Sequence, residues 1–242
     1  MKLVSVVIPA YNEEESIGNS IQEVKKAIKY ISNYDFEIIV INNNSKDKTE
    51  EIAKKNGAKV VFEDKKGYGH AYKKGLSEVK GDIIITGDGD ATYPFYDIPR
   101  FLKLMEESDF DFISTNRFAH LEEGSMPLLN HVGNFSLTFF SNLLYGTKIS
   151  DSQSGMVIFN RNYLDKVNLS ILSNGMPLCQ ELKLYAISLR VKFTEVPIKY
   201  RKRLGDAKLK PVKDGVENLI ELFKFKRKVR SEILKWPINR SI

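Results

Sequence analysis

The chain has 242 residues, of which 42% are hydrophobic and 28% are charged, and its formal net charge at pH 7 is +6. This length and apolar content fit one sizeable domain, and no repeat, low-complexity tract or linker divides the sequence. A single cysteine, Cys179, excludes an intramolecular disulfide and suits a reducing compartment. No cluster of histidine and cysteine has the spacing of a zinc site.

The N-terminal segment predicts a strand followed by a helix. Residues 4–8 are apolar apart from Ser5 and end at Pro9, which is expected to stop the strand. Asn12 is a good N-cap, and the acidic residues 13–15 would lie in the first helical turn, where carboxylates favour the helix dipole. Apolar residues then recur at helical spacing from Ile17 to residue 31, so we expect one face of this helix to be buried.

The same plan continues along the chain. The next elements that we expect are a strand at residues 36–41, a polar loop at 42–47, a helix ending near Gly57, a strand at 58–62, a turn at 66–69 with a short helix, and a strand at 82–87. Strands that alternate with helices at this spacing predict an α/β fold with a mainly parallel sheet flanked by helices. Ligands of such sheets bind beyond the carboxyl ends of the strands.

Asp88 and Asp90 stand one residue apart at the end of the strand at residues 82–87. Alternate side chains of an extended segment point the same way, so both carboxylates can face one ligand. Mg²⁺ or Mn²⁺ held in this way keeps open positions that a diphosphate can fill. A solvated Asp-Gly-Asp turn is the alternative. The metal interpretation is favoured because Asn12 and Asn43 fall at the ends of neighbouring strands.

An apolar segment at residues 128–144 is interrupted by His131 and Asn134, and is too short and too polar for a membrane span. We expect no signal peptide before the first strand. We expect a helix that faces the core, with a helix lying in the membrane interface as the alternative. Its apolar residues are Leu128, Leu129, Val132, Phe135, Phe139, Phe140, Leu143 and Leu144.

Positive charge gathers near the C-terminus. Residues 199–242 contain 14 Lys plus Arg and 5 Asp plus Glu, whereas the preceding residues contain 23 and 26. Apolar and basic residues alternate there: Leu219, Ile220, Leu222, Phe223 and Phe225 with Lys224, Lys226, Arg227, Lys228 and Arg230, followed by Trp236. We expect residues 211–242 to form a basic amphipathic helix and tail, packed on the domain or on an anionic membrane surface. Nucleic acid is not expected as a partner, because no recognition module is present.

Five segments together resemble a known family. They are Pro-Ala-Tyr-Asn-Glu at residues 9–13, Asn-Asn-Asn-Ser-Lys-Asp-Lys-Thr at 42–49, Gly-Asp-Gly-Asp-Ala-Thr-Tyr-Pro at 87–94, Thr-Asn-Arg at 115–117 and Asp-Ser-Gln-Ser-Gly-Met at 151–156. The set resembles family 2 glycosyltransferases of the GT-A fold, and within them the branch of dolichol-phosphate mannose synthase and related polyprenyl-phosphate sugar synthases. The resemblance implies a Rossmann-like GT-A domain over residues 1–210.

The resemblance also implies a reaction. A metal-dependent glycosyltransferase of this kind moves a sugar from a nucleotide sugar to a polyprenyl (dolichyl) phosphate, with a UDP-sugar as our first choice and GDP-mannose as the second. The nucleotide-binding residues carried over are Pro9, Tyr11, Glu13, Asn43, Asp88 and Gly89, and the metal ligands are Asp88 and Asp90. Two positions depart from the family pattern, because Asn43 replaces an aspartate and Thr92 a glutamine.

Other residues would act on the reacting groups. The resemblance implies catalytic roles for Asp90, Arg117, Asp151 and Arg203, and contacts to the acceptor phosphate from Arg117, His131, Arg203 and Lys208. A polyprenyl phosphate is already ionised at neutral pH, so it needs cations rather than a general base. His131 could equally be an ordinary helix residue, and Glu181, on an expected helix at residues 178–189, could lie on the acceptor side. We expect residues 201–208 to form a mobile loop, with Gly205 giving it backbone freedom.

Three alternatives stay open. The acceptor could be a sugar hydroxyl of a glycan or glycolipid. A sugar-phosphate nucleotidyltransferase would need a glycine-rich N-terminal loop, which this chain lacks, and a catalytically silent scaffold would have no use for clustered carboxylates and arginines. We expect a cytoplasmic protein, peripheral on the cytoplasmic face of the membrane. The resemblance leaves the sugar, the polyprenol length and the oligomeric state open.

Overall fold

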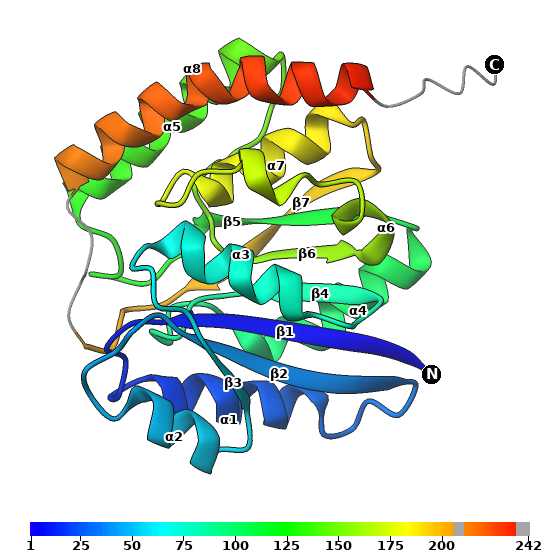
Figure 1. Cartoon of the computed structure of the whole chain (residues 1–242), viewed down its shortest axis with the longest axis vertical. Helices are drawn as coiled ribbons and strands as arrows, with labels where there is room; N and C mark the ends of the chain where they lie inside the picture. Colours follow the sequence, from blue (N-terminus) through cyan, green and yellow to red (C-terminus); the bar gives the residue numbers. More distant parts are fainter. Residues whose placement is uncertain (206–210, 236–242) are drawn as a thin grey trace.

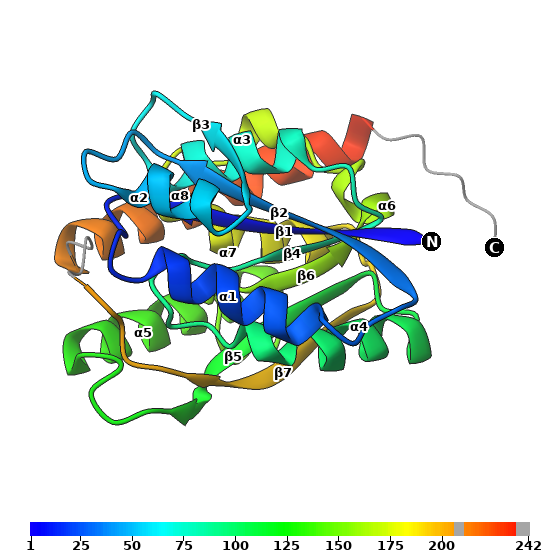
Figure 2. The same cartoon turned by 90° about the horizontal axis from the view of Figure 1, so that it is seen from below.

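The computed structural model describes residues 1–205 and 211–235, and these form one sheet covered by helices on both faces (Figures 1 and 2). The sheet has seven strands in the order β3-β2-β1-β4-β6-β5-β7. The strands are β1 (Lys2–Ala10), β2 (Tyr34–Asn42), β3 (Lys59–Phe62), β4 (Ile83–Thr86), β5 (Phe112–Leu121), β6 (Val157–Asn160) and β7 (Phe193–Tyr200). The predicted α/β architecture is confirmed.

The helices divide between the two faces of the sheet. They are α1 (Ile17–Ile28), α2 (Thr49–Lys55), α3 (Tyr68–Glu78), α4 (Ile98–Glu107), α5 (Leu128–Tyr145), α6 (Arg161–Leu164), α7 (Leu178–Ser188) and α8 (Pro211–Lys235), with 3₁₀ turns at Phe95–Asp97 and Leu169–Ile171. One core lies between the sheet and α1, α2 and α4, and the other between the sheet and α3, α6 and α7. On β1, Val6 faces the first core and Val7 the second, and each is fully buried. Burial of such a side chain is worth about 1.5–3 kcal/mol.

The strand pairing positions the site. β1 is parallel to β2 and β4, β2 is parallel to β3, and β5 is parallel to β7. β6 is antiparallel to both of its neighbours. The chain runs from β1 outward to β3 and then returns to the other side of β1 with β4, so the loops after β1 and β4 open a crevice at one edge of the sheet.

The first helix begins later than predicted. α1 starts at Ile17, and Asn12 is not its N-cap, because Asn12 has a positive φ of 52° in the preceding loop. Instead the Asn12 amide N–H donates to Ser45 Oγ at 3.0 Å, and Asn12 Oδ1 accepts from the Lys46 amide at 2.8 Å. The side chain is therefore used to join the loops after β1 and β2 rather than to cap a helix.

We expected residues 128–144 to form a helix whose apolar side chains face the core. For most of these side chains the expectation is wrong. Exposed side chains are Leu128, Leu129, Val132, Phe135, Phe139 and Leu143, whose exposed fractions run from 54% to 79%. The inward side of α5 is narrow and carries small or polar residues such as Thr138 and Ser141, which hydrogen-bond to Ser152 and to the helix backbone. We call the outward row of α5 the apolar stripe.

Helix α8 lies beside α5 and over α7 (Figure 1). Leu222, Phe225 and Val229 are buried in the second core, so these side chains of the expected amphipathic helix pack on the domain. Val212, Val216, Ile220 and Phe223 are exposed instead. No helix in residues 1–205 and 211–235 is long and apolar enough to cross a membrane. Lys208 and Trp236 lie outside the described residues.

Candidate active site

A cavity of about 500 Å³ opens at the carboxyl edge of the sheet. Its wall brings together most of the predicted site residues: Pro9, Tyr11, Glu13, Asn43, Asp88, Gly89, Asp90, Arg117 and Arg203. Further lining residues come from α3, α5, the segment before α7, and α8. This volume lies in the range of ligand pockets in proteins. Asp151 and His131 do not line the cavity.

Asp88 is held by two tyrosines that sequence reasoning missed. Tyr68 Oη donates to Asp88 Oδ1 at 2.8 Å, and Tyr72 Oη donates to the same oxygen at 3.2 Å. Burial, reinforced by the negative charge of Asp90, raises the pKa of Asp88 to about 7. The two tyrosines stand four residues apart, so they share one face of α3. That spacing, directly after the turn at residues 66–67, is the signal that could have identified them.

Asp90 is fixed on both of its oxygens. Asp90 Oδ1 accepts hydrogen bonds from the Thr92 amide at 3.1 Å and from Thr92 Oγ1 at 2.6 Å. Arg203 Nη1 lies 3.1 Å from Asp90 Oδ2, and Arg203 Nη2 lies 2.5 Å from Glu13 Oε1. Thr92, which departs from the family pattern, therefore orients Asp90. Arg203 joins the segment after β7 to the loops after β1 and β4.

The two carboxylates fit a hard divalent cation. Asp88 directs Oδ1 to the tyrosines, which orients the carboxylate, and Asp90 is oriented by Thr92. The described residues contain no group of three or more acidic, histidine or cysteine side chains placed to hold a metal ion. Asp88 and Asp90 would therefore hold Mg²⁺ or Mn²⁺ with diphosphate oxygens and water as the other ligands, which is usual for Mg²⁺.

Arg117 forms a buried ion pair with Asp151. Arg117 Nε donates to Asp151 Oδ2 at 2.7 Å and Arg117 Nη2 donates to Asp151 Oδ1 at 2.9 Å. Burial opposes ionisation, but Arg117 outweighs it and holds the pKa of Asp151 below its ordinary value. Lys183, which the sequence did not single out, donates from Nζ to the Asp151 carbonyl at 2.8 Å. Asp151 thus positions Arg117 at the cavity wall and is itself fully buried.

Asn43 uses both functions of its amide. Its Nδ2 donates to the Lys65 carbonyl at 2.7 Å, while its Oδ1 accepts from the Gly67 amide at 2.9 Å. An aspartate could not donate to Lys65, so the amide suits this loop. Nearby, Lys66 Nζ lies 3.2 Å from Tyr11 Oη and over the Tyr11 ring. Tyr11 and Lys66 both line the cavity, at the end where the family resemblance implies that the nucleotide binds.

Two predicted residues have other contacts. The His131 ring packs against Phe118, with 4.9 Å between ring centroids. Glu181, on α7, accepts from the Ser173 amide and from Ser173 Oγ, both at 2.6 Å. Glu181 is fully buried and does not line the cavity. It orders the segment before α7, whose Asn174 carbonyl accepts from the His70 amide at 3.1 Å.

Comparison with known proteins agrees with this geometry. Residues 5–167 match the family described as glycosyl transferase family 2. The low-salt glycan biosynthesis hexosyltransferase Agl6 of Haloferax volcanii is 39% identical over 214 residues, which are 88% of this chain and 51% of Agl6. This chain therefore spans about half the length of Agl6. A dolichyl-phosphate hexose transferase of the same organism is 31% identical over 212 residues, with 88% of this chain and 89% of that protein covered.

Another relative and a solved structure extend the comparison. A UDP-N-acetylglucosamine–dolichyl-phosphate N-acetylglucosaminyltransferase of Methanococcus voltae is 31% identical over 220 residues, with 82% of this chain and 85% of that protein covered. Glucosyl-3-phosphoglycerate synthase of Mycobacterium tuberculosis, crystallised with phosphoglyceric acid, has a TM-score of 0.72 at 20% identity and covers 93% of this chain and 80% of its own. That structure shares the fold. The sequence match over two thirds of the chain shows that this protein belongs to glycosyl transferase family 2.

Proposed function

We propose that this chain is a metal-dependent glycosyltransferase that moves a sugar from a nucleotide sugar to a polyprenyl (dolichyl) phosphate. The observation that carries the proposal is the meeting of two carboxylates, Asp88 and Asp90, with two arginines, Arg117 and Arg203, around one cavity. Two relatives whose names specify dolichyl phosphate support this acceptor class. A UDP-sugar is favoured as donor and GDP-mannose is second, because one of these relatives is named for a UDP-sugar.

The donor would lie along the edge of the sheet. Pro9, Tyr11, Glu13, Asn43 and Gly89 line the nucleotide end of the cavity. Mg²⁺ or Mn²⁺ on Asp88 and Asp90 would act as a Lewis acid toward the charge that develops on the leaving diphosphate. Arg203 lies beside Asp90 and can donate to the same phosphate oxygens through a planar pair of N–H groups.

The acceptor phosphate needs cations and no strong base. Arg117 lines the cavity, and its ion pair with Asp151 fixes the plane of the guanidinium. A phosphate monoester is ionised at neutral pH, so its oxygen can attack the sugar carbon directly. His131 and Lys208 remain predicted phosphate contacts. Such chemistry assigns the catalytic roles to Asp90, Arg117 and Arg203, with Asp151 as the group that positions Arg117.

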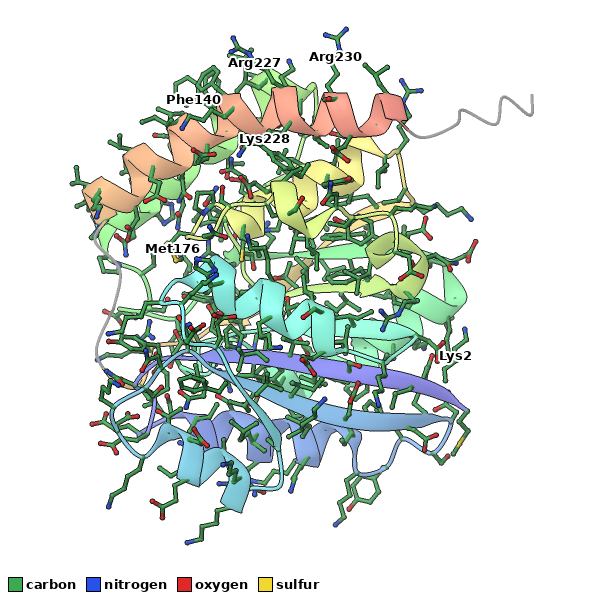
Figure 3. The ribbon with its side chains drawn as sticks, in the orientation of Figure 1. Lys2, Phe140, Met176, Arg227, Lys228 and Arg230 are labelled. Atoms are coloured by element: carbon green, nitrogen blue, oxygen red, sulfur yellow. The ribbon has the colours of Figure 1, made fainter. Side chains whose placement is uncertain are left out.

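A membrane surface is the proposed location of the acceptor. The apolar stripe of α5 and the exposed residues of α8 lie on helices that are side by side (Figures 1 and 2). Arg227 and Arg230 point outward from α8, away from the sheet (Figure 3). Apolar side chains flanked by exposed basic residues suit the interface of an anionic bilayer. We therefore place residues 1–210 as the catalytic domain and α8 as a helix that packs on it and faces the cytoplasmic leaflet.

A donor panel tests the reaction. UDP-glucose, UDP-N-acetylglucosamine and GDP-mannose are each incubated with Mn²⁺ and a short polyprenyl phosphate, and the lipid is analysed by mass spectrometry. We expect one lipid-linked hexose together with release of the nucleoside diphosphate, and no product from Asp90→Ala. Release of pyrophosphate would indicate nucleotidyl transfer instead. Product formed only on a free sugar hydroxyl would overturn the lipid acceptor.

A further inference from the structure

A buried polar network joins three helices to the loop that carries Asp151. Gln153 Nε2 donates to Ser152 Oγ at 2.8 Å and also to Gln180 Oε1 on α7. Thr138 Oγ1 on α5 is 3.0 Å from Ser152 Oγ. Asn218 Nδ2 on α8 donates to Gln153 Oε1 at 3.4 Å. The network thus lies under the outward-facing helices and next to the Arg117–Asp151 pair.

Asn218 is an unusual residue for its position. Only 7% of it is exposed, and its Oδ1 atom has no hydrogen-bond partner among residues 1–205 and 211–234. Gln180 Nε2 is also buried without a partner in the same part of the chain. Buried acceptors and donors are nearly always satisfied, because an unpaired one costs free energy comparable to a lost hydrogen bond. An ordered water or a ligand that reaches such a group would supply the partner.

Asn218 and Gln153 both line the cavity. The lining residues nearby on α5 and α8 include Asn130, Asn134 and Asp214, and no described residue of α5 or α8 that lines the cavity is basic. The cations of the cavity, Lys66, Arg117 and Arg203, come from other elements. An amide-rich wall without cations does not suit a phosphate. It suits neutral hydroxyl groups, which both donate and accept hydrogen bonds.

We propose that Asn218 and Gln153 form the subsite that binds the hydroxyl groups of a pyranose ring. Gln153 is adjacent to the reacting groups, because its backbone amide donates to Asp151 Oδ1 at 3.0 Å, and Asp151 holds Arg117. The pyranose is that of the nucleotide sugar, because the proposed acceptor is a polyprenyl phosphate that carries no sugar. This inference rests on the proposed function and adds that α8 determines which sugar is used.

Asn218→Leu separates the two roles that this asparagine could have. Leucine is similar in size, so it fills the same space while it removes the unpaired oxygen. If Asn218 served only the fold, the substitution would lower the melting temperature. For a binding residue we expect a melting temperature close to that of the parent, because removal of the unpaired buried acceptor offsets loss of the 3.4 Å hydrogen bond to Gln153 Oε1. Ser231→Ala, at an exposed position of α8, is the matched control.

Isothermal titration with Mn²⁺ present measures the binding role. We expect Asn218→Leu to bind UDP-glucose or GDP-mannose, whichever the parent protein binds more tightly, about five- to tenfold more weakly. Affinity for UDP or GDP alone should stay within twofold, because these ligands have no hexose. Asn218→Ala serves as a second variant if leucine lowers the melting temperature, since alanine keeps a high helix propensity.

The remaining outcomes are distinct. If nucleotide-sugar affinity is unchanged in both variants, or if UDP and GDP are weakened as much as the nucleotide sugar, the subsite is overturned. A parent protein that binds neither nucleotide sugar overturns the proposed function and the subsite with it, whereas intact binding that ignores Asn218 overturns the subsite alone.

Discussion

Three buried charged side chains, those of Arg117, Asp151 and Lys183, lie close together at or directly behind the wall of the cavity, and each affects the ionisation of the others. Arg117 is 7% exposed, and Asp151 and Lys183 are fully buried. The bidentate pair of Arg117 and Asp151 satisfies both groups, but Lys183 adds a further positive charge whose contact is a backbone carbonyl. Burial therefore lowers the pKa of Lys183 to about 8, although the nearby Asp151 acts in the opposite direction. A buried amine of this kind costs stability when it is protonated.

Lys183 is expected to make stability rise with pH. The ordinary lysine pKa is 10.5, so between pH 8 and 10.5 the folded protein binds fewer protons at this site than the unfolded chain. The free energy of unfolding therefore increases with pH, by about 2 kcal/mol between pH 7.5 and 9.5. Urea denaturation of the parent and of Lys183→Met at both pH values measures this, because other titrations cancel in the difference between the two proteins.

The control for this measurement is Lys148→Met, at an exposed position. We expect its difference from the parent to be the same at both pH values. The free energy of unfolding of the parent minus that of Lys183→Met should rise with pH. If this difference is constant or falls as pH rises, Lys183 is not a buried amine of lowered pKa in solution.

Single residues show what sequence could and could not predict. Asp88 and Asp90 were predicted because they follow a strand, and strand ends of a parallel sheet converge. Arg117, which lies within β5, was predicted from the family resemblance alone. Tyr68 and Lys183 were missed because each lies on a helix whose partner segment is far away in the sequence, at Asp88 and Asp151 respectively. The four-residue spacing of Tyr68 and Tyr72 shows that they share a face of α3, but it does not show which loop that face meets. For Lys183 the local pattern gives no such signal.

At the scale of elements, periodicity predicted helices but not their orientation. The segment of α5 is apolar at helical spacing, and that pattern is the same for a core helix and an interfacial one. The structure orients it by its small and polar residues, Thr138 and Ser141, and leaves the apolar stripe outward. The pattern of α8 was equally compatible with a core helix and an interfacial one. Here Leu222 and Phe225 pack inward on α7.

The outward faces of α5 and α8 predict two separable contributions to membrane binding. Val132→Asp with Phe135→Asp places carboxylates on the apolar stripe, and we expect binding to fall on neutral and anionic vesicles at every salt concentration. Arg227→Ala with Arg230→Ala should reduce binding about 10- to 30-fold on anionic vesicles at low salt, since each basic residue near the surface is worth about 1 kcal/mol. The effect of the two arginine substitutions should shrink at an ionic strength of about 1 M, where the Debye length is only about 3 Å.

Co-sedimentation with phosphatidylcholine vesicles, with and without phosphatidylserine, measures both effects. Tyr30→Asp is the matched control, because Tyr30 is 85% exposed but follows α1 on the other face of the sheet. All the substituted side chains are exposed, so the melting temperatures should match that of the parent. A parent protein that binds neither vesicle, or binding that ignores all four substitutions, would remove the membrane surface from the proposal.

At the scale of the whole molecule, the site is assembled from segments that are distant in the sequence. Glu13 follows β1, Asp90 follows β4 and Arg203 follows β7, and the arginine contacts both carboxylates. The alternation of strands and helices predicted that such loops share an edge. It did not predict the strand order, in which β6 is antiparallel between β4 and β5, because long-range pairing leaves no local periodicity.

Because one edge of the sheet gathers these segments, ligand binding there should stabilise the entire folded chain. Mn²⁺ with UDP or GDP at about 100 times the dissociation constant should add about 2.7 kcal/mol to the free energy of unfolding. For a chain of this size the melting temperature would rise by about 5–10 °C. When UDP and GDP are compared at the same concentration, the nucleotide that gives the larger shift identifies the preferred base, since the metal and diphosphate are common to both.

Asp90→Ala should remove the part of this stabilisation that depends on the metal. The variant keeps the nucleotide end of the cavity, with Tyr11 and Asn43, so we expect a small shift with UDP or GDP that is the same with Mn²⁺ and with a chelator. Arg230→Ala, on the outer side of α8, should respond to Mn²⁺ like the parent (Figure 3). If Mn²⁺ adds as much to Asp90→Ala as to the parent, the metal is held elsewhere, and the assignment of Asp88 and Asp90 as its ligands fails. Differential scanning fluorimetry of the three proteins, with each nucleotide alone and with Mn²⁺, separates these outcomes because the metal increment is read within each protein.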